Sequence, residues 1–140
     1  MPSPQPPRPM RVMVYSDNRQ VRRTVLTALG TRPDPDLPEL EFVEVATGPF
    51  AVRTASAGGL DLLILDGEAA PTGGLGLARQ LKDELHRCPP TLVLTGRPQD
   101  AWLATWSRAD AVVGHPIDPG QLAEAVTDVL RLRHDVATRS

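Results

Sequence analysis

The hydrophobic residues of this chain fall into short continuous runs separated by longer stretches in which they recur every three or four positions. The clearest run covers residues 62–65 and reads Leu-Leu-Ile-Leu, with the carboxylate of Asp66 directly after it. A run this short, bounded by polar and glycine positions, is typical of a strand buried on both faces. Four further strands are predicted at residues 11–15, 41–46, 91–95 and 111–114.

Between these strands, apolar spacing and capping residues predict helices. Asn18 and Gly30 are suited to begin and end the first helix, and Asp118-Pro119-Gly120-Gln121 is suited to open the last. Two more helices are predicted at residues 50–56 and about 100–108. The predicted apolar faces of the other three helices are Val21, Val25, Leu26 and Leu29; Leu75, Ala78, Leu81 and Leu85; and Leu122, Val126 and Val129.

The alternation of five strands with five helices predicts an α/β fold, a doubly wound parallel sheet with helices on both faces. We expect the domain to span residues 11–132. Residues 1–10 carry proline at nearly every second position, so we expect a disordered proline-rich tail, and residues 133–140 are expected to form a frayed C-terminal tail. The loop at residues 31–40 is longer than usual, which is typical either of a binding surface or of slack, and we favour the interpretation as slack.

Composition narrows the class of protein further. The chain has 140 residues, which suits one domain, and its formal net charge of -2 gives no reason to expect a nucleic-acid surface. The only cysteine is Cys88, which excludes an internal disulfide, and no apolar run is long enough to span a membrane. We therefore expect a cytoplasmic protein with no membrane insertion.

Polar residues follow four of the predicted strands. Asp17 comes after the first strand and Asp66 after the third, while Thr95-Gly96 closes the fourth and His115-Pro116 follows the fifth. Because the carboxyl ends of parallel strands share one edge of a sheet, we expect these side chains to lie together.

These residues, in this order, resemble the receiver domain of response regulators, of the stand-alone kind. The resemblance covers about residues 10–132 and includes Gly74-Leu75 at the start of the third helix. It implies a sheet with the strand order 2-1-3-4-5 and Asp66 as the phosphoacceptor. It also implies Mg²⁺ ligation by Asp17, Asp66 and the backbone carbonyl of Glu68, with Thr95 as the switch hydroxyl.

The chemistry of phosphoryl transfer is consistent with this assignment. A carboxylate that attacks a phosphoryl donor needs a divalent cation to neutralise the crowded negative charge, and Asp17 and Asp66 would supply the carboxylates that Mg²⁺ prefers. The absent side chain of Gly96 leaves room for the phosphoryl group. The Thr95 hydroxyl can turn to donate a hydrogen bond to that group.

Three positions depart from the family pattern. Ser16 replaces the first of two adjacent acids, so Mg²⁺ affinity should fall. His115 replaces a lysine as the residue that contacts the phosphoryl group, and an imidazole is charged only when its surroundings favour the proton. Val112 stands where an aromatic residue often swings inward. We therefore describe the pocket as degenerate and the chain as an atypical receiver.

Two tryptophans lie four residues apart on the predicted fourth helix. Trp102 and Trp106 would share one face of that helix, and exposed indoles in a protein with 4% aromatic residues would make good interface anchors. The sequence thus favours a non-enzymatic interaction module that docks on a protein partner, either a larger assembly or a histidine kinase. Weak Mg²⁺ binding is the only cofactor expected.

Two alternatives remain open. The first is a conventional phosphorelay receiver that a histidine kinase phosphorylates on Asp66. The second is a flavin-binding electron carrier on the same kind of sheet, although the carboxylate of Asp17 after the first strand would repel a flavin phosphate.

Overall fold

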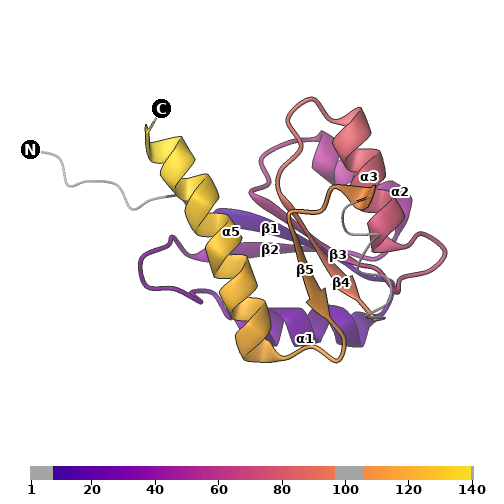
Figure 1. The fold of residues 1–140 in the computed structure, drawn as a ribbon, viewed down its shortest axis with the longest axis horizontal. Coiled ribbons are helices and arrows are strands. Elements are labelled where there is room, and N and C mark those ends of the chain that lie inside the picture. Colours follow the sequence, from indigo (N-terminus) through magenta and orange to yellow (C-terminus); the bar gives the residue numbers. More distant parts are fainter. Residues whose placement is uncertain (1–7, 97–105, 140) are drawn as a thin grey trace, which may run out of the picture.

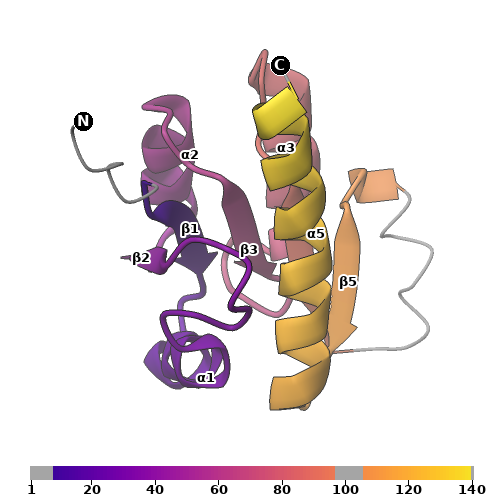
Figure 2. The ribbon, with the colours of Figure 1, turned by 90° about the vertical axis from the view of Figure 1, so that its left-hand side faces the viewer.

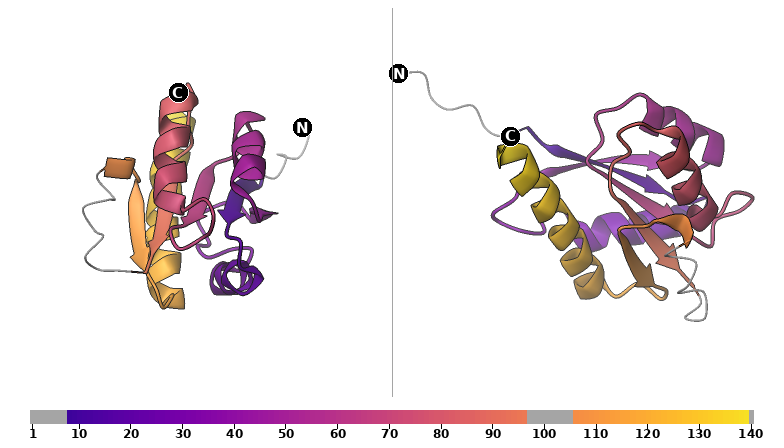
Figure 3. Two further views of the ribbon diagram at one scale, coloured as in Figure 1. Left: turned by 90° about the vertical axis from the view of Figure 1, so that its right-hand side faces the viewer. Right: turned by 45° about the horizontal axis from the view of Figure 1, so that its top comes forward.

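A computed structural model of the chain describes residues 8–96 and 106–139 (Figure 1). Five strands form one sheet, in the order β2-β1-β3-β4-β5, and every neighbouring pair is parallel. This confirms the fold class and the strand order. The strands are β1 (Met10–Tyr15), β2 (Leu40–Val45), β3 (Leu62–Asp66), β4 (Thr91–Thr95) and β5 (Ala111–Gly114). The third and fourth are the most completely buried, and β5 lies at one edge of the sheet (Figure 3).

Four helices lie within the described residues, namely α1 (Arg19–Leu29), α2 (Gly48–Ser56), α3 (Gly74–Glu84) and α5 (Pro119–Arg139). The predicted caps are present, because the Asn18 side chain accepts the backbone N–H of Gln20 and the Asp118 side chain accepts that of Gln121. Gly30 ends α1 with a φ of 59°, which favours glycine. Most of the helix predicted at about residues 100–108 lies outside the described residues. Within the part that is described, residues 106 and 107 are helical.

The side chains of the strands alternate between two hydrophobic layers, one on each face of the sheet. In the ribbon, α1 and α2 lie on opposite sides of β1 and β2 (Figure 2). In β1, Val12 and Val14 pack toward α1 and α5, while Met13 and Tyr15 pack toward α2 and α3. This alternation follows from the two-residue period of a strand. The sheet is therefore covered on both faces, and chemistry is confined to its edges and ends.

The loop before β2 is held in place, and its interpretation as slack was wrong. Asp34 and Leu37 are buried, and Asp34 forms an ion pair with Arg131 of α5. The Asp34 carboxylate also accepts the backbone N–H of Asp36 at 2.7 Å, and the N–H of Leu40 donates to the carbonyl of Thr31 at 2.7 Å. The ordering comes from a partner 97 residues away, which local sequence patterns do not reveal.

Helix α5 continues to Arg139, through the segment expected to fray. Arg133 anchors this part of the helix, because its guanidinium donates to the Asp61 carboxylate at 3.1 Å and to the Leu60 carbonyl at 3.2 Å. None of the helices in the described ranges combines the length and the apolar character that crossing a membrane requires.

Candidate functional site

Asp66 lies at the carboxyl end of β3, with its side chain only 3% exposed, and both carboxylate oxygens have partners within the chain. Oδ2 accepts a hydrogen bond from the Ser16 hydroxyl at 2.7 Å. Oδ1 accepts the backbone N–H of Glu68 at 2.9 Å and lies 3.4 Å from Nε2 of His115. Three strand ends, those of β1, β3 and β5, thus meet at one carboxylate.

The sequence after Asp66 keeps this strand end close to the start of α3. A Cβ atom on Gly74, the first residue of α3, would lie 2.7 Å from the backbone carbonyl atoms of Asp66. Only glycine therefore allows the helix to begin so near the strand. In addition, the N–H of Gly67 donates to the carbonyl of Leu94 at 2.7 Å, which holds the loop after β3 against β4.

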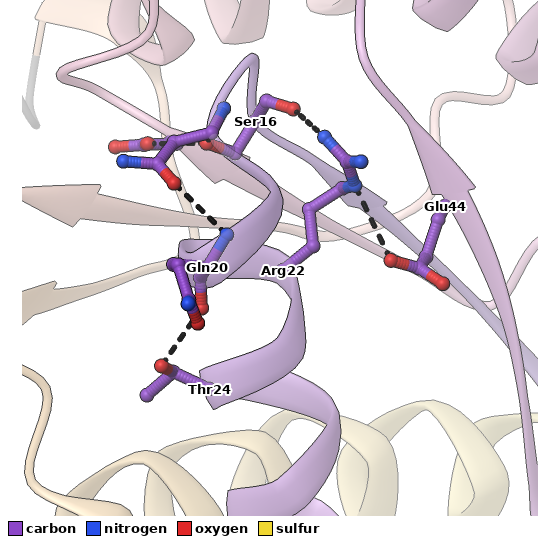
Figure 4. Close-up of polar contacts among 7 residues, drawn as sticks. Ser16, Gln20, Arg22, Thr24 and Glu44 are labelled. Atoms are coloured by element: carbon purple, nitrogen blue, oxygen red, sulfur yellow. Dashed lines mark hydrogen bonds and ion pairs between the residues drawn. The ribbon is translucent and has the colours of Figure 1, made fainter.

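Ser16 is fully buried and is held in position by both its side chain and its backbone. Its hydroxyl oxygen accepts the N–H of Asn18 at 3.0 Å while it donates to Asp66. Its carbonyl accepts a bond from Arg22 at 2.6 Å, and Arg22 also donates to Glu44 of β2 at 3.2 Å (Figure 4). The serine is therefore an integral part of the site, where the sequence analysis recorded only a missing acid.

Asp17 is exposed beside this cluster. Its charge affects the neighbouring Tyr15. Burial raises the pKa of the Tyr15 phenol, and the negative charges of Asp17 and Asp66 raise that pKa further. The phenol donates to the carbonyl of Thr72 at 2.6 Å, which ties β1 to the loop before α3. Both acids thus act on the same tyrosine from the carboxyl edge of the sheet.

The end of β4 contributes a contact that the sequence analysis missed. The backbone N–H of Gly96 donates to Oε1 of Glu68 at 3.0 Å, although only the carbonyl of Glu68 had been considered. The neighbouring Thr95 is half-buried, and its carbonyl accepts the N–H of His115 at 2.8 Å. The sequence offered one signal for this contact, namely that Glu68 is an acid two positions after the buried Asp66.

Val112 and Trp106, the other two described positions that the sequence analysis singled out, are both exposed. Val112 of β5 is 38% exposed and Trp106 is 43% exposed. The guanidinium of Arg79, on α3, stacks over the Trp106 ring at 4.8 Å and donates to the Trp106 carbonyl at 2.7 Å. Trp102 lies outside the described residues.

The oxygen donors fit a magnesium ion held by few protein ligands. Asp17, Asp66 and the Glu68 carbonyl offer only hard oxygen atoms, as Mg²⁺ prefers. The described part of the chain has no group of three or more His, Cys, Asp or Glu side chains that could hold a metal. Ser16 contributes a neutral hydroxyl where a third carboxylate would have added charge.

No protein-family model matches the chain. Uncharacterized response regulatory proteins from two strains of Mycobacterium tuberculosis are each 62% identical to it over 122 residues, covering 87% of this chain and 92% of each relative.

Solved structures show the same fold at lower identity. The chemotaxis response regulator CheY4 of Vibrio cholerae has a TM-score of 0.74 and 20% identity, covering 88% of this chain and 100% of that one. The response regulatory domain of protein mrkE from Klebsiella pneumoniae has a TM-score of 0.75 and 16% identity, covering 90% and 99%. With its strand order and its close relatives, this chain belongs to the response regulators, and its fold is that of a receiver domain.

Proposed function

We propose that this receiver domain is atypical and works chiefly as a docking module on a protein partner. The observation that carries the proposal is the engagement of Asp66. Its two oxygens accept hydrogen bonds from the Ser16 hydroxyl and the Glu68 amide, so each oxygen already has a donor within the chain. A carboxylate held in this way is a poorer nucleophile, because these hydrogen bonds must weaken as its charge moves to a new bond.

Magnesium has a limited place in this proposal. Asp17, Asp66 and the carbonyl of Glu68 would hold the ion, which would neutralise charge around a phosphoryl group when bound. Ser16 keeps Asp66 hydrogen-bonded without adding negative charge, so we expect weak Mg²⁺ binding.

Docking requires a surface, and Trp106 supports one. A tryptophan that is 43% exposed and already stacked by Arg79 presents a large rigid contact area at little cost in side-chain entropy. We propose a protein partner in the cytoplasm, with no enzymatic reaction, no nucleic acid and no membrane insertion. Family membership leaves the flavin-carrier alternative without support.

A conventional phosphorelay receiver is the second candidate, and His115 favours it. Its Nε2 lies 3.4 Å from Asp66, so a protonated imidazole would place a positive charge beside a phosphoryl group. Asp17 and Thr95 also lie at the carboxyl ends of their strands, at the same edge of the sheet. In this alternative, a histidine kinase phosphorylates Asp66 and the modification controls the partner.

Affinity capture from the native cell separates the two candidates. Wild type, Asp66→Asn and Trp106→Ala are compared, with the bound proteins quantified by mass spectrometry. Phe50→Ala is the matched control, because Phe50 is a similarly exposed aromatic residue (49%) on α2. Circular dichroism confirms that each variant is folded.

The docking proposal expects one partner that Asp66→Asn and Phe50→Ala retain at the wild-type level and Trp106→Ala loses. A partner gained or lost with Asp66→Asn would contradict it and favour the phosphorelay receiver.

A further inference from the structure

The side chain of Glu68 bridges the loop after β3 and the end of β4. Its Oε1 accepts the backbone N–H of Gly96 at 3.0 Å, and its own backbone N–H donates to Oδ1 of Asp66 at 2.9 Å. One residue therefore connects the carboxylate of the site to the backbone N–H that directly follows the neighbouring strand, β4.

The fit of this carboxylate against Gly96 is close. A Cβ atom on Gly96 would lie 2.5 Å from Oε1 and 2.7 Å from Cδ of Glu68, which is closer than real Cβ atoms approach. The space that the sequence analysis reserved for a phosphoryl group thus holds an anionic group of this chain. Any other residue at position 96 would push the glutamate away.

An N–H that binds a carboxylate is suited to bind other oxyanions, since both offer negatively charged oxygen acceptors. Asp66 pairs with Leu94 in the register of β3 and β4, so Gly96 is only two residues beyond the residue paired with the phosphoacceptor. A phosphoryl group on Asp66 that projects toward β4 would meet the Glu68 carboxylate there. Two anions cannot share one donor without strong repulsion.

We propose that Glu68 is an internal competitor that occupies the oxyanion subsite of this receiver. The Gly96 N–H is the donor of that subsite, and Glu68 must leave it before a phosphoryl group on Asp66 can use it. The inference rests on the proposed receiver function and deepens it, because it names the residue that sets the affinity of the pocket for an oxyanion.

The test uses beryllofluoride, a phosphoryl mimic, titrated into the full chain in the presence of Mg²⁺ and followed by amide NMR. Wild type is compared with Glu68→Ala and Glu68→Gln. Glu84→Ala is the matched control, because Glu84 is another glutamate that accepts a hydrogen bond, from Gln80 on the surface of α3.

Removing the competing charge should tighten beryllofluoride binding by about tenfold in Glu68→Ala, since hydrogen bonds to charged groups are among the stronger ones. Glu68→Gln, which keeps an oxygen acceptor without the charge, should fall between Glu68→Ala and wild type. Before any beryllofluoride is added, the Gly96 amide resonance should shift in Glu68→Ala and stay in place in Glu84→Ala.

Three results would overturn the inference: an unchanged Gly96 resonance in Glu68→Ala, equal beryllofluoride affinity in wild type and Glu68→Ala, or no binding to any variant. None of these bears on partner capture by Asp66→Asn, so failure of the subsite and failure of the docking function remain distinguishable.

Discussion

Ser16 illustrates how one neutral side chain changes the chemistry of a buried carboxylate. An acid at this position would add a second charge beside Asp66 and would depend on a cation to offset the repulsion. The serine instead donates a hydrogen bond at 2.7 Å and is itself fixed through Asn18 and Arg22. The site is therefore hydrogen-bonded by the chain's own residues. The sequence could reveal the substitution but not this bond, because Ser16 and Asp66 are 50 residues apart.

Tyr15 gives a pH-dependent prediction at the same scale. Burial and the charges of Asp17 and Asp66 raise the pKa of its phenol above the usual 10.0, so the folded protein holds the proton more tightly than the unfolded chain. The resulting stabilisation is complete below about pH 10 and is lost as the pH rises through the folded-state pKa. The neutral phenol also donates to Thr72, which its ionised form cannot do.

We therefore expect the stability advantage of wild type over Tyr15→Phe, about 1 kcal/mol at neutral pH, to shrink above about pH 10. Urea unfolding at several pH values measures this difference. Tyr15 is the only tyrosine in the chain, so its ultraviolet absorbance reports the titration directly. A phenol that titrates at or below pH 10 in the folded protein would contradict the prediction.

At the scale of the element, Gly74 fixes how closely α3 approaches β3. A Cβ atom on Gly74 would lie 2.7 Å from the Asp66 carbonyl, so a side chain there would prevent the close approach. A Cβ atom on Gly76, two residues later in the same helix, would meet no atom within 4 Å. Gly74→Ala should cost about 2 kcal/mol of unfolding free energy or more, because the helix must shift away from the strand. Gly76→Ala should be neutral or gain about 0.5 kcal/mol from helix propensity.

Chemical denaturation of the two alanine variants measures this difference. Equal stabilities of Gly74→Ala and Gly76→Ala would show that the close approach is not needed.

The docked loop before β2 gives a second prediction at this scale. The Asp34 carboxylate is 8% exposed and holds both Arg131 and the N–H of Asp36, so Asp34→Ala should lower the unfolding free energy by about 2 kcal/mol. Asp36 is the internal control. Its side chain is 85% exposed, and its carboxylate lies 4.0 Å from the same arginine, which is a long distance for an ion pair.

Asp36→Ala should change stability by no more than about 0.5 kcal/mol. Urea denaturation midpoints compare the two variants, and an Asp34→Ala midpoint equal to that of wild type would mean that the loop is slack after all.

The elements that could be predicted are those whose signals are local. The apolar run of β3 and the caps at Asn18 and Asp118 lie within a few residues of the structure they specify. Long-range contacts leave no local signal in the sequence. The ion pair between Asp34 and Arg131 is such a contact, so the fixed conformation of residues 31–39 could not be predicted. In α3, Leu77 is fully buried although the predicted face omitted it, because the helix packs against β3 and β4 with a wider face than the spacing of its leucines indicated.

The candidate site likewise contains some residues that the sequence could place and others that it could not. Parallel strands bring their carboxyl ends to one edge, so Asp66 and His115 could be placed together from the strand pattern alone. The side chain of Glu68 could not be placed, because its position depends on how the loop after β3 folds back onto Gly96.

At the scale of the whole molecule, α5 runs from the carboxyl ends of the strands to their amino ends. It begins at Pro119, shortly after His115 at the carboxyl edge, and Arg131 and Arg133 fix its far half to Asp34 and Asp61, which precede β2 and β3. Its 21 residues span about 31 Å. A helix fixed by ion pairs in its far half responds little to a small change at its near end, unless a side chain between the two moves with that change.

Val112 occupies the position at which the resemblance to receivers implies a residue that carries such a change through β5, and a valine side chain is unsuited to that role. It is 38% exposed at the edge of the sheet, and a branched valine has neither the length nor the rotamer freedom to swing inward. We therefore expect saturating beryllofluoride to slow amide hydrogen exchange around residues 66–69 and 94–96 but to change it by less than about twofold in β5 and α5. Exchange followed by mass spectrometry on the full chain measures both regions. A larger change in α5 would show that the signal travels by a route independent of Val112, and it would favour the phosphorelay receiver over the docking module.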